Sequence, residues 1–100
     1  MAKGYVVAMI TVNNMEDYKP YMAQTAALVE EYGGQYLIRG AEQDIKESKP
    51  PHDRFVVIEF ESRAQANAFY HDARYEEVRK IRQANSEGFV FITEGFNPPK

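Results

Sequence analysis

Cysteine and tryptophan are absent from this 100-residue chain, and only two histidines are present. Without cysteine the chain can form no disulfide, no thiolate nucleophile and no zinc–sulfur site. His52 and His71 lie far apart, and neither belongs to an H-x-x-H or H-E-x-x-H motif. The carboxylates of the polar stretch 41–53 lack the spacing of a calcium-binding loop. We therefore expect no metal site and no cofactor.

A strong charge of either sign and a long hydrophobic run are also missing. The net charge of −3 gives no basic surface for nucleic acid or for an anionic membrane. No apolar run approaches the roughly 20 residues that a membrane span requires. The strand pattern begins directly at Gly4, which leaves no room for a signal peptide. We expect a cytoplasmic protein that binds neither nucleic acid nor membranes.

What the chain does contain is typical of one small globular domain. Hydrophobic residues make up 44% and charged residues 27% of the sequence, which is ordinary for a folded protein. One hundred residues suffice for a single domain, here covering 1–100 with its core at about 4–95. Seven tyrosines and six phenylalanines are present, and each buried tyrosine needs a partner for its hydroxyl group.

The first half of the chain predicts a strand, a helix and a sharp stop. Gly4 to Val12 is β-branched and apolar without a helical period, which favours a strand. Large residues then recur every three or four positions from Tyr18 to Tyr32, which indicates one buried helical face. Because an interior proline costs about 3 kcal/mol, we expect a short first turn and a main helix that starts near Pro20. Gly33-Gly34 is typical of a helix C-terminus.

The second half predicts two more strands, a divided helix and a last strand. Ser62-x-x-Gln65 is a capping box that opens the helix, and Asp72 is suited to cap a second helical segment after a break at His71-Asp72. In order, the expected elements are a strand over 35–40, a polar loop over 41–53, a strand over 54–61, the divided helix and a strand over 89–95. The order β-α-β-β-α-β predicts a ferredoxin-like α+β fold with a four-stranded antiparallel sheet.

Both faces of this sheet are apolar, although two helices can cover only one. Alternation along the strands assigns Tyr36 and Ile38 to the helix side, and Arg39 and Glu59 to the outer side. The outer set is too apolar for water, since large exposed apolar patches are unusual on monomers. It contains Val7, Met9, Leu37, Phe55, Val57, Phe89 and Phe91. We therefore expect a homodimer in which two sheets pack face to face.

Several short motifs, in this order and spacing, resemble the family catalogued as domain of unknown function 1330. They are the pair Tyr18 and Tyr21, the Gly33-Gly34 stop, the Arg39-Gly40 and Glu59-Phe60 strand ends, and Phe69-Tyr70-x-x-x-x-Tyr75 followed by Arg82. The resemblance covers about Gly4 to Gly95 and implies a ferredoxin-like monomer that pairs into a dimeric α/β barrel. It supplies no function. The chain departs from the pattern at Ala41, where a second glycine is common, and at His71-Asp72, which replaces Asn-Ser.

The candidate binding residues suggest a small-molecule pocket between the helices and the sheet. They are Tyr18, Tyr21, Arg39, Tyr70, Tyr75 and Arg82. Arg39 could anchor a carboxylate or enolate oxygen, because a guanidinium binds such groups bidentately; a structural ion pair with Glu59 is the alternative. The tyrosines have the spacing of core residues as well. Glu59, if buried, and His71 are the weak candidates for a catalytic base or proton shuttle.

Three classes of function stay open from the sequence. The first is a non-catalytic binding dimer with a possible small organic ligand. The second is a cofactor-independent enzyme of the monooxygenase, isomerase or lyase type acting on a small organic acid, and the third is a purely structural interaction module. An RNA-recognition module is disfavoured, because strand 54–61 lacks the two glycines of that signature. The loop 41–53 is interpreted as a mobile lid, a passive insertion or a dimer contact.

Overall fold

The chain folds into the predicted order of elements, with the second helix divided in two. In the computed structural model, which describes residues 2–97, these are β1 (Gly4–Val12), α1 (Met15–Glu31), β2 (Gln35–Arg39), β3 (Arg54–Phe60), α2 (Arg63–Tyr70), α3 (Ala73–Asn85) and β4 (Ser86–Glu94). Met1 and positions 98–100 of the predicted domain lie outside the described residues. Strand β4 begins three residues earlier than expected, because Ser86, Glu87 and Gly88 pair with the end of the long strand β1.

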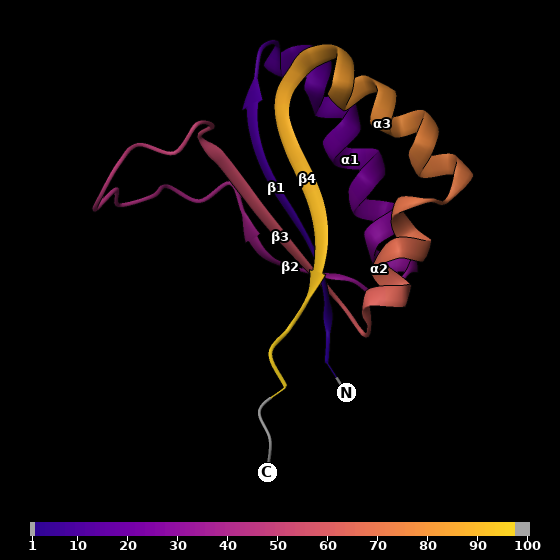
Figure 1. Ribbon diagram of the computed structural model, residues 1–100. Coiled ribbons are helices and arrows are strands. Elements are labelled where there is room, and N and C mark those ends of the chain that lie inside the picture. Colours follow the sequence, from indigo (N-terminus) through magenta and orange to yellow (C-terminus); the bar gives the residue numbers. More distant parts are fainter. Residues whose placement is uncertain (1, 98–100) are drawn as a thin grey trace.

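The strands form one antiparallel sheet in the order β2-β3-β1-β4. Val7 of β1 lies opposite Val57 of β3 on one side and Phe91 of β4 on the other. Figure 1 shows the helices together on one face of this sheet, while no helix covers the opposite face within the described residues. The ferredoxin-like fold predicted from the sequence is thus confirmed. No helix of residues 2–97 is both long enough and apolar enough to cross a membrane.

Helix α1 is continuous from Met15, so the expectation of a main helix starting near Pro20 is wrong. The side chain of Asn14 accepts a hydrogen bond of 3.2 Å from the Asp17 amide and caps the first turn. Pro20 removes only one amide, whose acceptor would be the carbonyl of the exposed residue Glu16. Water can satisfy that carbonyl, and the proline is therefore tolerated.

The two predicted helix boundaries at Gly33-Gly34 and Asp72 are confirmed. Gly33 has φ of +73°, and the Gly34 amide donates to the Val29 carbonyl at 2.8 Å, which is the six-to-one bond of a Schellman motif. Asp72 caps α3 by accepting from the Arg74 amide at 2.7 Å, and it also accepts from the Tyr32 hydroxyl at 2.6 Å. The hydrogen bonds from Arg74 and then from Tyr32 lower the pKa of Asp72. This carboxylate joins the end of α1 to the break between α2 and α3.

A bulge in β2 changes the predicted faces of two residues. The pairing register shifts between Tyr36 and Ile38, so that Ile38 lies opposite Val57 and Arg39 lies opposite Val56. A bulge adds one residue to a strand and reverses the alternation beyond it. Ile38 therefore faces the outer side and Arg39 the helix side, opposite to the faces expected from strict alternation. The bulge separates Arg39 from Glu59 and places it on the helix side of the sheet, where the residue remains exposed.

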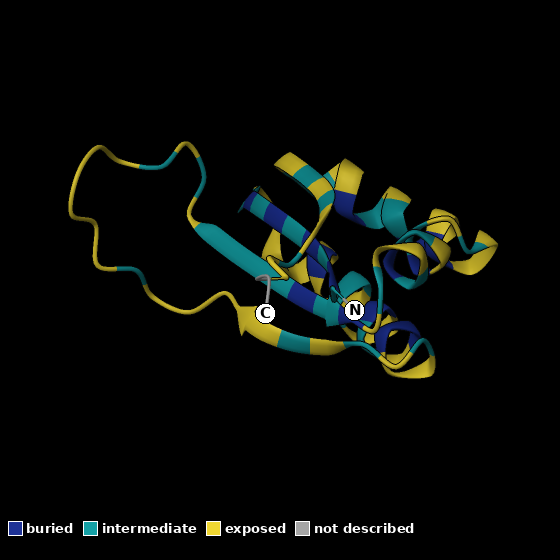
Figure 2. Ribbon diagram, turned by 60° about the horizontal axis from the view of Figure 1, so that its bottom comes forward, coloured by how far each residue is buried: buried dark blue, intermediate teal, exposed yellow. Residues whose placement is uncertain are grey.

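The two faces of the sheet differ in burial, and Figure 2 shows exposed residues along the projecting loop. On the helix side Val6, Ile10 and Phe60 are buried. On the outer side Leu37, Phe89 and Phe91 are 47%, 43% and 49% exposed. The loop 41–53 extends away from the body of the domain in both ribbon views. At its base, Gln43 Nε2 donates to the Asp53 carbonyl at 3.1 Å.

Candidate functional site

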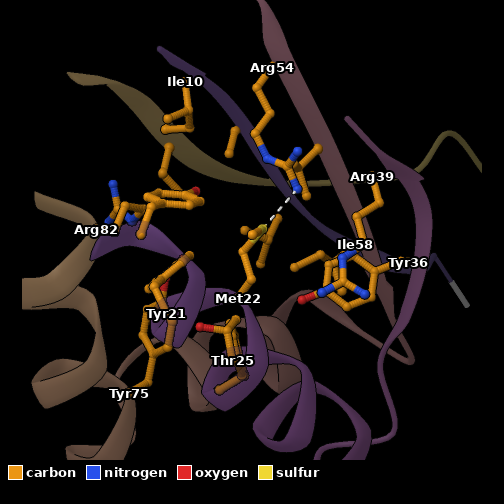
Figure 3. Close-up of a pocket in the computed structure, with 16 residues that line it drawn as sticks. Ile10, Tyr21, Met22, Thr25, Tyr36, Arg39, Arg54, Ile58, Tyr75 and Arg82 are labelled. Carbon is orange, nitrogen blue, oxygen red and sulfur yellow. Dashed lines mark hydrogen bonds between the residues drawn. The ribbon is translucent and has the colours of Figure 1, made fainter. Parts of the chain in front are cut away.

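A cavity of about 40 Å³ lies between α1, α3 and the helix side of the sheet (Figure 3). Its sheet wall is apolar and comes from residues that alternate inward on the strands, such as Ala8, Ile58 and Val90. The groups that can bind a ligand come from both helices and from the ends of β2 and β3. These polar lining residues are Tyr18, Tyr21, Thr25, Tyr36, Arg39, Arg54, Tyr75 and Arg82.

Arginine is the charged residue of this cavity. Arg39, Arg54 and Arg82 line it, and no Asp, Glu or His of residues 2–97 does so. In the described part of the chain, none of the three lies within ion-pair distance of a carboxylate. Because a guanidinium stays protonated even when buried, the cavity carries positive charge without a counter-charge from the described residues.

Two of these guanidinium groups contain a buried donor without an acceptor. Nε of Arg54 and Nε of Arg82 have no hydrogen-bond partner in the described chain, and neither does the hydroxyl of Thr25. Arg82 is only 8% exposed. A buried polar group without a partner costs roughly 1–3 kcal/mol, and a charged one costs more. Three such atoms therefore surround one cavity.

Arg54 and Arg39 are held at the sheet end of the cavity by local packing. Nη2 of Arg54 approaches Met22 Sδ at 3.5 Å, and thioether sulfur is a weak acceptor. Gly40 has φ of +74°, and a Cβ at this position would collide with Nη1 of Arg54. The Cζ atom of Arg39 lies 4.4 Å from the ring centroid of Tyr36, a cation–π contact that orients the side chain.

Tyrosines form the helix side of the cavity. The hydroxyl groups of Tyr21 and Tyr75 are 2.6 Å apart and hydrogen-bonded, which joins α1 to α3. Burial raises the pKa of Tyr21 far above its ordinary value, and burial also raises the pKa of Tyr75. Both phenols are therefore neutral at physiological pH. Arg82 Cζ lies 5.9 Å from the Tyr21 ring centroid, so the cation is beside neutral rings rather than a phenolate.

Five of the six predicted binding residues meet at this cavity. They are Tyr18, Tyr21, Arg39, Tyr75 and Arg82. Tyr70 does not line it; it borders a shallow surface depression with His71, and Arg79 Cζ lies 4.6 Å from its ring centroid. Sequence analysis missed Arg54, although the alternation with Val56 and Ile58 in β3 could have placed it on the helix side.

The two candidate catalytic residues lie elsewhere. Glu59 is on the outer face of the sheet and accepts a hydrogen bond of 3.0 Å from the Tyr5 hydroxyl, which raises the pKa of Tyr5. His71 is exposed at the end of α2. Neither side chain lines the cavity. Among residues 2–97 there is also no group of three or more His, Cys, Asp or Glu side chains that could hold a metal ion.

Fold and site together define a ferredoxin-like α+β protein with an arginine-lined cavity between helices and sheet. The chain matches the family described as domain of unknown function (DUF1330) over residues 3–96 and belongs to that family. No match was found among curated proteins.

Solved structures from several bacteria share the fold. A protein of unknown function from Rhodopseudomonas palustris has a TM-score of 0.75 and 18% identity, covering 97% of this chain and 85% of that one. A dimeric ferredoxin-like protein of unknown function from Jannaschia sp. CCS1 has a TM-score of 0.69 and 15% identity, covering 95% and 99%. SnoaB, a cofactor-independent oxygenase from Streptomyces nogalater, has a TM-score of 0.66 and 12% identity, covering 98% and 97%.

Proposed function

We propose that the protein is a homodimer that binds a small organic acid in the cavity of each subunit. The observation that carries this proposal is the arginine lining without a described carboxylate partner, together with the buried unpartnered Nε atoms of Arg54 and Arg82. A buried charge without a partner is strongly unfavourable. A carboxylate supplies both the missing charge and the missing acceptors, because it pairs with a guanidinium through two parallel hydrogen bonds.

The size of the cavity limits the ligand. At about 40 Å³ it has room for on the order of three water molecules, far below the roughly 300–1,000 Å³ of pockets for drug-sized ligands. Met22 lies beside Arg54 at the cavity, and a flexible methionine can move to enlarge the space. These dimensions favour an acid of a few carbon atoms over a large aromatic ligand.

The outer face of the sheet supports the homodimer. Leu37, Phe89 and Phe91 are nearly half exposed on it, and the rings of Phe89 and Phe91 stack with centroids 6.2 Å apart. Apolar patches of this kind mark association sites. The protein from Jannaschia is described as dimeric, which favours the same assembly here. Since the cavity lies on the helix side, dimerisation leaves it free.

A cofactor-independent enzyme acting on the same acid is the second candidate. Its support is the fold shared with SnoaB, a cofactor-independent oxygenase, and fold alone is a weak guide to chemistry. The binding role is favoured here because none of the described carboxylates or histidines lines the cavity to act as a base. If the wild type consumes oxygen or converts an added enolisable acid, and Arg82→Met does not, the protein is an enzyme.

A thermal-shift screen of small carboxylates tests the binding role directly. A ligand present at 100 times its dissociation constant adds about 2.7 kcal/mol of stability. We expect a carboxylate to raise the melting temperature of the wild type and of Glu59→Gln, whose side chain lies on the other face. Arg54→Met should reduce the shift, and the double variant Arg54→Met/Arg82→Met should abolish it. If no acid stabilises the wild type, the proposed binding role is wrong, and a purely structural interaction module becomes the favoured class of function.

A further inference from the structure

We infer that the ligand is a short dicarboxylate, with one carboxylate bound by Arg82 and the other by Arg54 and Arg39. The inference rests on the proposed function and specifies the ligand of the same cavity. Its basis is that the unpartnered guanidinium donors occur at two places rather than one.

The first place is on the helix side. Arg82 belongs to α3, is 8% exposed and has its Nε buried without a partner among the described residues. Beside it, the hydroxyl groups of Tyr21 and Tyr75 are hydrogen-bonded to each other at 2.6 Å, and the Tyr75 hydroxyl also interacts with the guanidinium of Arg82. Neutral phenols cannot neutralise a guanidinium, so a negative group of the ligand is the partner that Arg82 lacks.

The second place is at the ends of β2 and β3. Arg39 lies opposite Val56, two residues beyond Arg54, so the two side chains are diagonal neighbours on one sheet face. Such neighbours are separated by about 7–8 Å, and like charges at this separation repel, although water at the exposed residue Arg39 weakens the repulsion. Nε of Arg54 is buried without an acceptor in the described chain, and its Nη2 approaches the sulfur of Met22 at 3.5 Å. One carboxylate near both arginines would relieve the repulsion.

The two places lie on different sides of the cavity. In Figure 3, Arg82 is on one side, Arg54 and Arg39 are on the other, and the side chain of Met22 extends between them. A monocarboxylate on Arg82 leaves Nε of Arg54 without a partner. A monocarboxylate on Arg54 likewise leaves Nε of Arg82 without one. Two carboxylates satisfy both donors and reduce the charge of the site from three positive to one positive. The cavity accepts even the shortest dicarboxylate only when Met22 moves aside, so the chain between the two carboxylates is limited to a few carbons.

Isothermal titration calorimetry with acids of matched length tests this inference. The probes are oxalate, malonate, succinate and glutarate, each compared with the monocarboxylate of equal carbon number at constant ionic strength. For the best-fitting length we expect the dicarboxylate to bind at least about tenfold more tightly. Arg82→Met and Arg54→Met should each reduce this preference to less than about twofold while a monocarboxylate still binds.

Arg79→Met is the matched control, since this arginine also belongs to α3 but stacks on Tyr70 outside the cavity. It should keep the full preference. Arg82→Lys provides a second variant if Arg82→Met does not fold. It should lose most of the preference for dicarboxylates, because lysine cannot form the two parallel hydrogen bonds that a guanidinium forms with a carboxylate. Equal affinity for mono- and dicarboxylates in the wild type overturns the two-ended ligand but leaves the proposed function standing. Binding of neither kind of acid contradicts the proposed function itself.

Discussion

The two faces of the same sheet carry different chemistry. The helix side contains three arginines around a small cavity, whereas the outer side presents half-exposed phenylalanines and leucine. Strand β3 contributes to both, with Arg54 and Val56 facing the cavity and Phe55 and Val57 facing outward. Because side chains alternate along a strand, one short segment can serve a binding site and an association surface. Substitutions can therefore alter either face of the sheet without changing the other.

The largest effect should follow from a charge on the outer face. We expect Phe91→Glu to weaken the dimer at least about 100-fold, since each subunit loses roughly 1.5–3 kcal/mol of apolar burial. Sedimentation equilibrium of the variant and the wild type measures this change. Carboxylate binding by the monomeric variant should match the wild type. A wild type that is monomeric at tens of micromolar would contradict the homodimer.

The second-largest effect is expected from Gly40→Ala, which should change the cavity. Its φ of +74° costs a non-glycine residue about 1–2 kcal/mol, and the new Cβ would displace the guanidinium of Arg54. Gly33→Ala is the matched control, because φ is +73° there and a Cβ would meet open space. We expect both variants to lose similar stability in urea. Only Gly40→Ala should weaken carboxylate binding, by about tenfold; equal binding by both would argue against Arg54 as an anchor.

Arg82→Met should leave the ligand-free protein as stable as the wild type or more stable, by up to about 1 kcal/mol. Replacing a buried charge that lacks a partner with an apolar side chain of similar size removes an unfavourable term. Urea unfolding without added acid measures the difference. A large loss of stability would show that Arg82 has a structural role in the core.

The smallest expected effect is that of pH on ligand affinity. Arginine stays protonated, and burial raises the pKa of Tyr18, Tyr21 and Tyr75 above the ordinary 10.0, so no cavity group named here titrates between about pH 6 and 9. The affinity for a carboxylate should be constant over this range. Because these tyrosines have higher pKa values in the folded state than in the unfolded state, their contribution to the stability of the fold is complete below pH 10 and is lost as the pH rises further. Titrations at several pH values check this, and a bell-shaped profile would indicate another group.

The sequence predicted the fold more fully than the site. Local signals such as Gly33-Gly34 and Asp72 marked helix ends, because caps depend on residues close in the chain. The face of Arg39 could not be predicted, since the bulge in β2 depends on its pairing with β3. The burial of Arg82 likewise depends on how α1 and α3 pack together. Local patterns contain no information on such contacts between distant segments.

We expect Arg54 and Arg82 to bind a small organic acid through their buried Nε–H groups. Proton–nitrogen correlation spectra of the arginine Nε–H signals test it most directly, with assignments from Arg54→Met and Arg82→Met. On titration with succinate or malonate, whichever binds more tightly, we predict downfield shifts of both signals and none for Arg79. If an acid binds and the Arg54 and Arg82 signals stay unchanged, these arginines are not its ligands.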